Sequence, residues 1–224
     1  VRNQAHGSPG NLLDLYGAVD IPECETFGIS KFPIPGLRRE PGYIRTQEDP
    51  DPVMLQFASS AAHTRGKPLV SSESFTWLAE HFRTSLSQCK PELDQLFLSG
   101  VNHVFFHGTT YSPREAAWPG WLFYASVHFG PTNTFWRDIP AFNRYIARCQ
   151  SLLQEGRPDR DILLYWPVYD IWSDATYPRL DYQITIHNLH DWLLESDFYH
   201  VSNQLKAGGW QGDFVSDAIA QEAI

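Results

Sequence analysis

The sequence is poor in the features that mark several protein classes. Its 224 residues include only three widely spaced cysteines, Cys24, Cys89 and Cys149, so we expect neither a disulfide framework nor a cysteine-based zinc site. No run reaches the roughly 18 apolar residues that a membrane span needs, so we expect no membrane contact. The formal net charge of −9 argues against a nucleic-acid partner, because nucleic acids require basic patches.

Several catalytic motifs are also missing. The sequence contains no GxSxG elbow, no glycine-rich phosphate loop, no HExxH and no CxxC pair. Its first residues, VRNQAHGSPG, lack the apolar core of a signal peptide and do not begin with Met. We therefore expect a fragment of a longer protein, and a missing signal in a fragment says nothing about export.

Aromatic residues are abundant and make up 14% of the chain, with eight tryptophans. Many aromatics beside many loops suit a site that stacks on sugar rings, although any single aromatic is more often part of a core.

Short apolar runs alternate with amphipathic ones, a pattern that predicts βα units and a parallel sheet. We expect strands within 17–28, 68–73, 101–113 and 162–172. We expect helices over 53–66, 75–100 (in two pieces broken near Pro91), 139–156 and 189–209.

The stretch RPDRD (157–161) reads as a junction between two domains. We expect residues 1–156 to be the C-terminal part of a (β/α)8 TIM-type barrel. Residues 157–224 would begin a second α/β domain.

Ionisable side chains follow four successive predicted strands. They are His6, then Glu23 and Glu25, then Glu73, then His107. Because a (β/α) barrel carries its chemistry at the C-terminal ends of its strands, four such positions in a row predict an active-site face.

Paired carboxylates at a barrel mouth are typical catalytic groups for glycoside hydrolysis. One protonates the leaving oxygen, and the other activates water or attacks the anomeric carbon. Glu73 is the first candidate, with a helix-start carboxylate as the alternative. Glu23 and Glu25 lie two apart and would point the same way on a strand. They could act as acid or base, bind a hard cation such as calcium, or belong to a solvated loop.

The remaining candidates would bind substrate. His6 and His107 could hydrogen-bond sugar hydroxyls or tune a carboxylate, with a structural role as the alternative. Each is followed by a glycine that permits close approach. Trp77, close to Glu73, would line the sugar site. Trp118 and Trp121, in the Pro/Gly-rich stretch AAWPGW, could stack on a sugar or plug the barrel rim.

Three long segments resemble bacterial glycoside hydrolase family 106, the α-L-rhamnosidases. They are RNQAHGSPGNLLDLYGAVDIPECETFG, GKPLVSSESFTWLAEHFRTSLSQCKPELDQLFLSGVNHVFFHGTTYSP and the stretch from WPGWLFYASVHFG to LLYWPVYDIW. The resemblance implies a large exported protein, periplasmic or extracellular, with a central (β/α) barrel. It also implies inverting hydrolysis of terminal α-L-rhamnosides in plant polysaccharides or glycosides, with calcium at the active site.

The resemblance assigns candidate roles to the carboxylates of this chain. Glu73 would be the general base or its partner, Glu25 the second catalytic carboxylate, and Glu23 a metal ligand. Only about four barrel strands are present, so we expect the chain alone to have little or no activity. The alternatives are a non-catalytic carbohydrate-binding fragment and another barrel glycosidase, such as a β-galactosidase.

Overall fold

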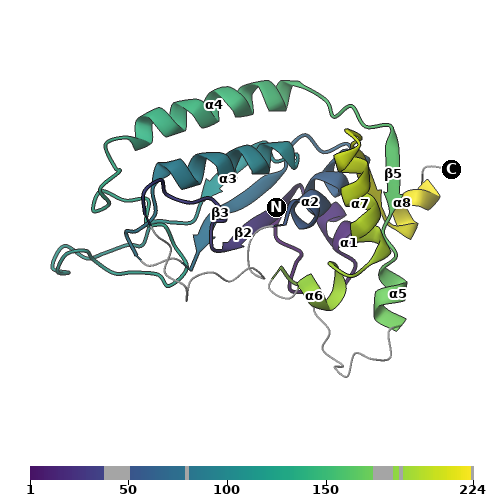
Figure 1. Cartoon of the computed structure of the whole chain (residues 1–224), viewed down its shortest axis with the longest axis horizontal. Coiled ribbons are helices and arrows are strands. Elements are labelled where there is room, and N and C mark those ends of the chain that lie inside the picture. Colours follow the sequence, from purple (N-terminus) through teal and green to yellow (C-terminus); the bar gives the residue numbers. More distant parts are fainter. Residues whose placement is uncertain (38–50, 79–80, 174–183, 187–188, 223–224) are drawn as a thin grey trace.

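The fold is known from a computed structural model, which describes residues 1–37, 51–78, 81–173, 184–186 and 189–222 (Figure 1). It is a mixed α/β structure with two parallel sheets. The predicted parallel α/β class is therefore confirmed for the described residues.

The larger sheet has four parallel strands in the order β1-β2-β3-β4, so each strand neighbours the next one along the chain. The strands are Arg2–Asn3 (β1), Ile21–Gly28 (β2), Ser71–Trp77 (β3) and His103–Phe106 (β4). Because the strands are parallel and sequential, their carboxyl ends lie along one edge of the sheet.

Three helices of the described chain connect these strands and a fourth follows the last strand, and local signals fix where the helices begin. They are Leu12–Gly17 (α1), Pro52–Thr64 (α2), Leu86–Leu98 (α3) and Ile139–Glu155 (α4). Asp51 caps α2 by accepting a 2.7 Å hydrogen bond from the Val53 amide, and Pro52 occupies the first turn. Ser85 and Gln88 form a capping box that starts α3.

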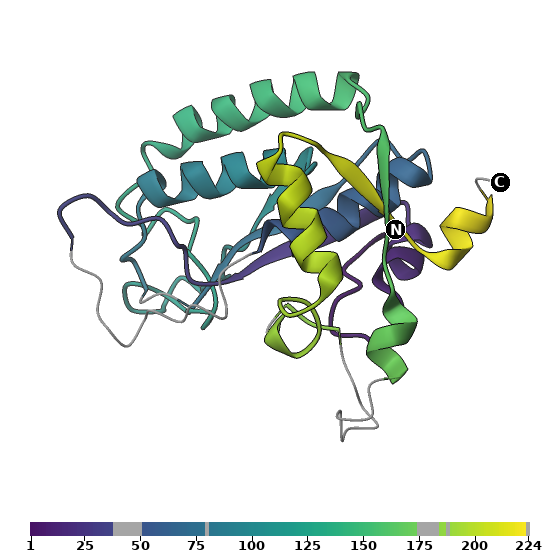
Figure 2. The ribbon, with the colours of Figure 1, turned by 45° about the vertical axis from the view of Figure 1, so that its right-hand side comes forward.

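Helix α4 is the outermost element and lies over α3 (Figures 1 and 2). Its Tyr145 hydroxyl donates a 2.6 Å hydrogen bond to Asp94 of α3, and its Gln150 side chain accepts a 2.7 Å bond from the Val104 amide of β4. Only Ile139, Phe142 and Ile146 of α4 are buried. The predicted amphipathic helix over this segment is confirmed.

The smaller sheet pairs two parallel strands, Ile162–Tyr165 (β5) and Gly212–Val215 (β6). The helices of this part are Val168–Ser173 (α5), Leu189–Trp192 (α6), Asp197–Ala207 (α7) and Asp217–Glu222 (α8).

Helix α2 joins the two sheets. Its Phe57 is fully buried among Trp166, Trp192, Phe198 and Phe214, with ring centroids 5.0 Å from Trp166 and 5.1 Å from Phe214. One apolar core therefore includes residues from both sheets. The domain boundary at residue 156 stays a prediction.

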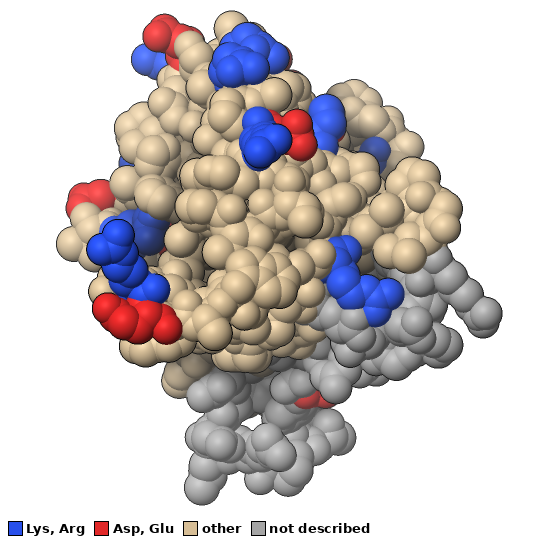
Figure 3. All heavy atoms as spheres, turned by 90° about the vertical axis from the view of Figure 1, so that its left-hand side faces the viewer, with Lys and Arg blue, Asp and Glu red and all other residues tan. Residues whose placement is uncertain are grey.

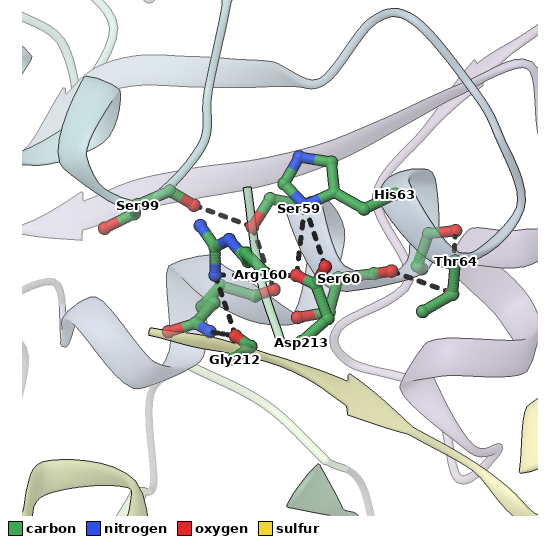
Figure 4. Close-up of polar contacts among 10 residues, drawn as sticks. Ser59, Ser60, His63, Thr64, Ser99, Arg160, Gly212 and Asp213 are labelled. Carbon is green, nitrogen blue, oxygen red and sulfur yellow. Dashed lines mark hydrogen bonds and ion pairs between the residues drawn. The ribbon is translucent and has the colours of Figure 1, made fainter. Parts of the chain in front are cut away.

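Buried polar contacts reinforce this junction (Figure 4). Gln56 of α2 donates a 2.5 Å hydrogen bond to the Gly212 carbonyl of β6, and His63 Nδ1 lies 3.0 Å from Asp213 Oδ1. Arg160 donates to the same Gly212 carbonyl at 2.8 Å and lies 3.4 Å from Asp213 Oδ1. Gln56, His63, Arg160 and Asp213 thus meet partners at this junction, which offsets the free-energy cost of burying them.

Several predicted boundaries were wrong. Residues 75–77 extend β3 instead of starting a helix, because Phe75 and Trp77 bury their rings in a second apolar cluster beneath the sheet. Helix α3 continues through Pro91, since that residue lies near the helix start and loses a single backbone bond while Leu93 and Leu96 remain packed. The predicted helix over 189–209 is two helices, α6 and α7, separated at Ser196, which caps α7.

Among the described helices, none is long and apolar enough to cross a bilayer.

Candidate functional site

The two leading carboxylates face each other across neighbouring strands. In the β2–β3 register Glu25 pairs with Glu73, and Glu23 pairs with Ser71. Side chains directly opposite on parallel strands lie on the same face of the sheet. The carboxyl groups of Glu25 and Glu73 accordingly form a direct hydrogen bond.

A local irregularity in the sheet accompanies this pair. The register shifts between Glu25 and Phe27, so β3 contains an extra residue just after Glu73. There Phe75 adopts a φ of 72°, a left-handed conformation that an aromatic residue rarely takes, and its amide donates a 2.7 Å bond to Thr26 Oγ1. Such bulges bend a strand and redirect its side chains, and they are common beside active sites.

The two carboxyl groups have pKa values shifted in opposite directions. Burial raises the pKa of Glu25 above its ordinary value, its contact with Glu73 raises it further, and His6 partly opposes the effect. Burial also acts to raise the pKa of Glu73, but hydrogen bonds from Glu25 and Thr76 and the charge of His107 outweigh it, so this pKa is lowered. Of the two carboxyl groups, Glu25 is therefore the one more readily protonated and Glu73 the one more readily ionised.

Both predicted histidines contact this pair or act on it. His6 follows β1, and its Nε2 lies 3.1 Å from Glu25 Oε2. His107 directly follows β4, where its amide donates a 2.7 Å hydrogen bond to the Ser74 carbonyl, and its charge helps to keep Glu73 ionised. The structure thus brings four of the predicted residues together, but the prediction that all of them follow their strands was wrong: Glu25 and Glu73 lie within β2 and β3, and only His6 and His107 follow their strands.

Glu23 lies beside the pair, and three side chains contact its carboxyl group. Ser71 Oγ donates to it at 2.9 Å, Arg2 Nε lies 3.1 Å away, and Gln4 Nε2 reaches it at 3.4 Å. Burial raises its pKa despite these partners. Within the described ranges no group of three or more His, Cys, Asp or Glu side chains is arranged to hold a metal ion. These residues alone do not fit the six to eight oxygen ligands of calcium.

The three predicted tryptophans differ in exposure to solvent. Trp77 is 1% exposed and packs edge-on against Phe75, with ring centroids 5.3 Å apart, so its position is that of a core residue. Trp118 and Trp121 are 74% and 59% exposed on the loop between β4 and α4. These two remain available to a ligand.

Sequence reasoning missed one pair of residues, His81 and His128. Their ring nitrogens lie 2.7 Å apart, and Phe82 stacks on the His128 ring with centroids separated by 5.2 Å. Burial lowers the pKa of His128 to about 4, and the nearby His81 and His107 add to the effect. No sequence signal indicated this pair, because the two histidines lie 47 residues apart and neither follows a predicted strand.

Glu73 is not a helix-start carboxylate, which was the alternative interpretation. It lies within β3, and the next helix of the described chain begins at Leu86.

Comparison with known proteins places this arrangement in context. Residues 41–180, more than half of the chain, match glycoside hydrolase family 106, described as alpha-L-rhamnosidase. A Formosa agariphila protein named for β-glucuronidase activity is 36% identical over 114 residues, which are 49% of this chain and 9% of that protein.

A solved structure of a rhamnosidase from Novosphingobium sp. PP1Y has a similar fold, with a TM-score of 0.55 at 18% identity. The similarity covers 92% of this chain but 16% of the rhamnosidase. The chain therefore spans only a small part of each of these proteins.

Proposed function

Since this chain belongs to glycoside hydrolase family 106, the α-L-rhamnosidases, we propose that it supplies part of the active site of an enzyme that cleaves terminal α-L-rhamnosyl residues. The substrates would be plant polysaccharides or glycosides that contain rhamnose. The observation that carries this proposal is the Glu25–Glu73 pair, in which two carboxyl groups on adjacent strands face each other and have pKa values shifted in opposite directions.

In this proposal Glu73 is the general base. Its lowered pKa keeps it ionised near neutral pH, and Thr76 Oγ1 fixes one of its oxygens through a 2.8 Å hydrogen bond. A fixed, ionised carboxylate can accept a proton from the attacking water. His107 supports this state from the neighbouring strand end.

Glu25, the more readily protonated of the two, would hydrogen-bond Glu73 and position it. An inverting pair keeps its carboxyl groups roughly 6.5–9.5 Å apart so that water fits between them. Glu25 and Glu73 are hydrogen-bonded and leave no such room. We therefore assign both carboxylates to one side of the glycosidic bond, and a carboxyl group outside the described residues would protonate the leaving oxygen.

The four-stranded sheet would be part of a (β/α)8 barrel within residues 1–156, and residues 157–224 would begin the next domain. Sequential parallel strands with intervening helices support the barrel. An open four-stranded piece of barrel lacks half of the wall around the substrate. We therefore expect the chain alone to hydrolyse aryl α-L-rhamnosides at a negligible rate.

Calcium and export also belong to this proposal, by family resemblance. Because the described residues do not form a complete calcium site, a bound ion in the full-length parent protein would need further ligands. Loss of activity on chelation and its return with added calcium would test this point. Secretion of the parent protein into the periplasm or medium would test its location.

The relative named for β-glucuronidase activity supports a second candidate, a glycosidase that acts on glucuronides. An aryl α-L-rhamnoside and an aryl β-D-glucuronide separate the two when they are offered to the full-length parent protein. A parent protein that binds saccharides and hydrolyses no glycoside would instead indicate a binding module.

The deciding variant is Glu73→Gln in the parent protein, with Glu155→Gln on the exposed end of α4 as the matched control. We expect Glu73→Gln to lower kcat by roughly two to four powers of ten while substrate binding persists, since a general base contributes about that much. The control should retain the full rate. An undiminished kcat in a folded Glu73→Gln protein would remove Glu73 from the mechanism.

A further inference from the structure

A cleft of about 420 Å³ lies in the loop that joins β4 to α4. Its volume falls within the roughly 300–1,000 Å³ that is typical of small-molecule pockets. The loop projects at the left of Figure 1 and therefore faces the viewer in Figure 3. The residues that carry the argument are Phe82, Thr110, Trp118, Trp121, His128 and Thr132, all of which line the cleft.

Aromatic side chains form a preorganised wall. Phe82 stacks on Trp118, with ring centroids 5.9 Å apart and planes inclined by 28°, and its ring also stacks on buried His128. Ser112 Oγ accepts a 2.8 Å hydrogen bond from the Trp121 amide and so fixes the backbone at that residue. Exposed rings held in place in this way suit the apolar face of a pyranose ring.

The cleft lacks formal charge. None of the described residues that line it is Lys, Arg, Asp or Glu, and its polar groups are hydroxyls such as those of Thr110 and Thr132. Because the pKa of His128 is lowered to about 4, this imidazole is neutral at pH 7. Figure 3 agrees, since uncharged atoms dominate this face and charged side chains lie mainly at its margins.

Electrostatic contacts link the cleft to the carboxylate pair. His107 is the first residue of the loop, and its charge influences both Glu73 and His128. His107 therefore lies within electrostatic range of both Glu73 and His128, a residue of the cleft wall.

We infer that this cleft binds an uncharged pyranose ring of the substrate and discriminates against uronic acids. The inference rests on the proposed glycosidase function and adds a determinant of substrate choice. A uronate carries a carboxylate where a 6-deoxyhexose such as rhamnose carries a methyl group. Burial of that carboxylate beside Trp118 and Phe82, with no cation among the described lining residues, would cost free energy without compensation.

Calorimetric titration of the full-length parent protein tests the inference. The probes are methyl α-L-rhamnopyranoside and methyl β-D-glucopyranosiduronate. We expect saturable binding of the first and at least tenfold weaker binding of the second. Trp118→Ala should raise the Kd for the rhamnoside about tenfold, as expected for loss of a stacking surface. Trp136→Ala is the matched control, because Trp136 is a 41% exposed residue of the same loop that is not in the cleft lining.

Thr132→Arg places a cation in the cleft and should strengthen uronate binding about tenfold. Equal affinity of the wild-type protein for both probes, or rhamnoside binding unaltered by Trp118→Ala, would overturn the inference. Hydrolysis assays keep the two proposals apart. A protein that binds the rhamnoside through Trp118 but hydrolyses no rhamnoside contradicts the proposed function alone.

Discussion

The His81–His128 pair makes the stability of the chain depend on pH in a defined direction. His128 is 5% exposed, and burial lowers its pKa from 6.5 to about 4. Below pH 6.5 the unfolded chain takes up a proton on this imidazole, whereas the folded chain resists protonation until about pH 4. The contribution of neutral His128 to stability is therefore intact above pH 6.5 and is lost progressively as the pH falls to about 4.

The size of this loss follows from the two pKa values. At about 1.4 kcal/mol per pH unit, lowering the pKa from 6.5 to about 4 corresponds to at most about 3.5 kcal/mol. His128→Asn removes the titrating group and tolerates the local backbone, because His128 has a φ of 59° and asparagine adopts this left-handed region readily. The variant also loses the ring contact with Phe82, a cost that does not vary with pH.

Urea unfolding of the 224-residue chain and its variants at pH 7, 6, 5 and 4 provides the assay. We expect the stability of His128→Asn relative to wild type to rise by about 2–3 kcal/mol between pH 7 and pH 4. His200→Asn, which removes an exposed imidazole on α7, serves as the control and should show no such trend. A constant difference between His128→Asn and wild type over this range would refute the reasoning.

Three further predictions concern the junction, the packing of α2 and the carboxylate pair. Phe57→Ala should destabilise the chain by about 3–5 kcal/mol in urea unfolding, because a fully buried ring leaves a cavity, whereas 75% exposed Leu98→Ala should cost under about 0.5 kcal/mol. Gly100→Ala should be clearly more destabilising than Gly209→Ala. Both glycines have positive φ, but only at Gly100 would the new Cβ meet Ser59, at 2.6 Å; equal losses would contradict this packing. Glu25→Ala should raise the pKa of Glu73, because it removes a hydrogen bond that lowers this pKa. In the parent protein acting on an aryl α-L-rhamnoside, the acidic limb of the pH profile of kcat/KM should therefore move to higher pH. An acidic limb that stays in place would separate Glu25 from the base.

Much of the local structure could be read from the sequence. Alternating apolar and amphipathic runs located the strands and the long helices. Burial of a strand in a sheet or of one face of a helix imposes a regular spacing of apolar residues, and this spacing can be read from the sequence. The polar residues in and near the predicted strands pointed to Glu25, Glu73, His6 and His107, because neighbouring parallel strands bring such positions close together. The expectation that all four follow their strands was wrong for Glu25 and Glu73, which lie within β2 and β3.

Local signals failed where tertiary packing outweighed them. Phe75 and Trp77 look like the start of a helix, yet their rings fill an apolar cluster and hold residues 71–77 in a strand. Trp77 for this reason lies in the core, although the sequence placed it at the sugar site beside Trp118 and Trp121. A single sequence does not indicate which of two nearby aromatics will be buried.

The sequence by itself determined the α/β class, the family and the set of ionisable residues that the sheet brings together. Only the tertiary structure decided how those residues differ in burial, in hydrogen-bond partners and in pKa. The β2–β3 register sets Glu25 opposite Glu73, which shifts their pKa values in opposite directions, and the same pairing buries Glu23 among Ser71, Arg2 and Gln4. The physical reason is that the pKa of a carboxyl group depends on burial and on neighbours within a few ångströms, and these neighbours come from strands and loops far apart in the chain.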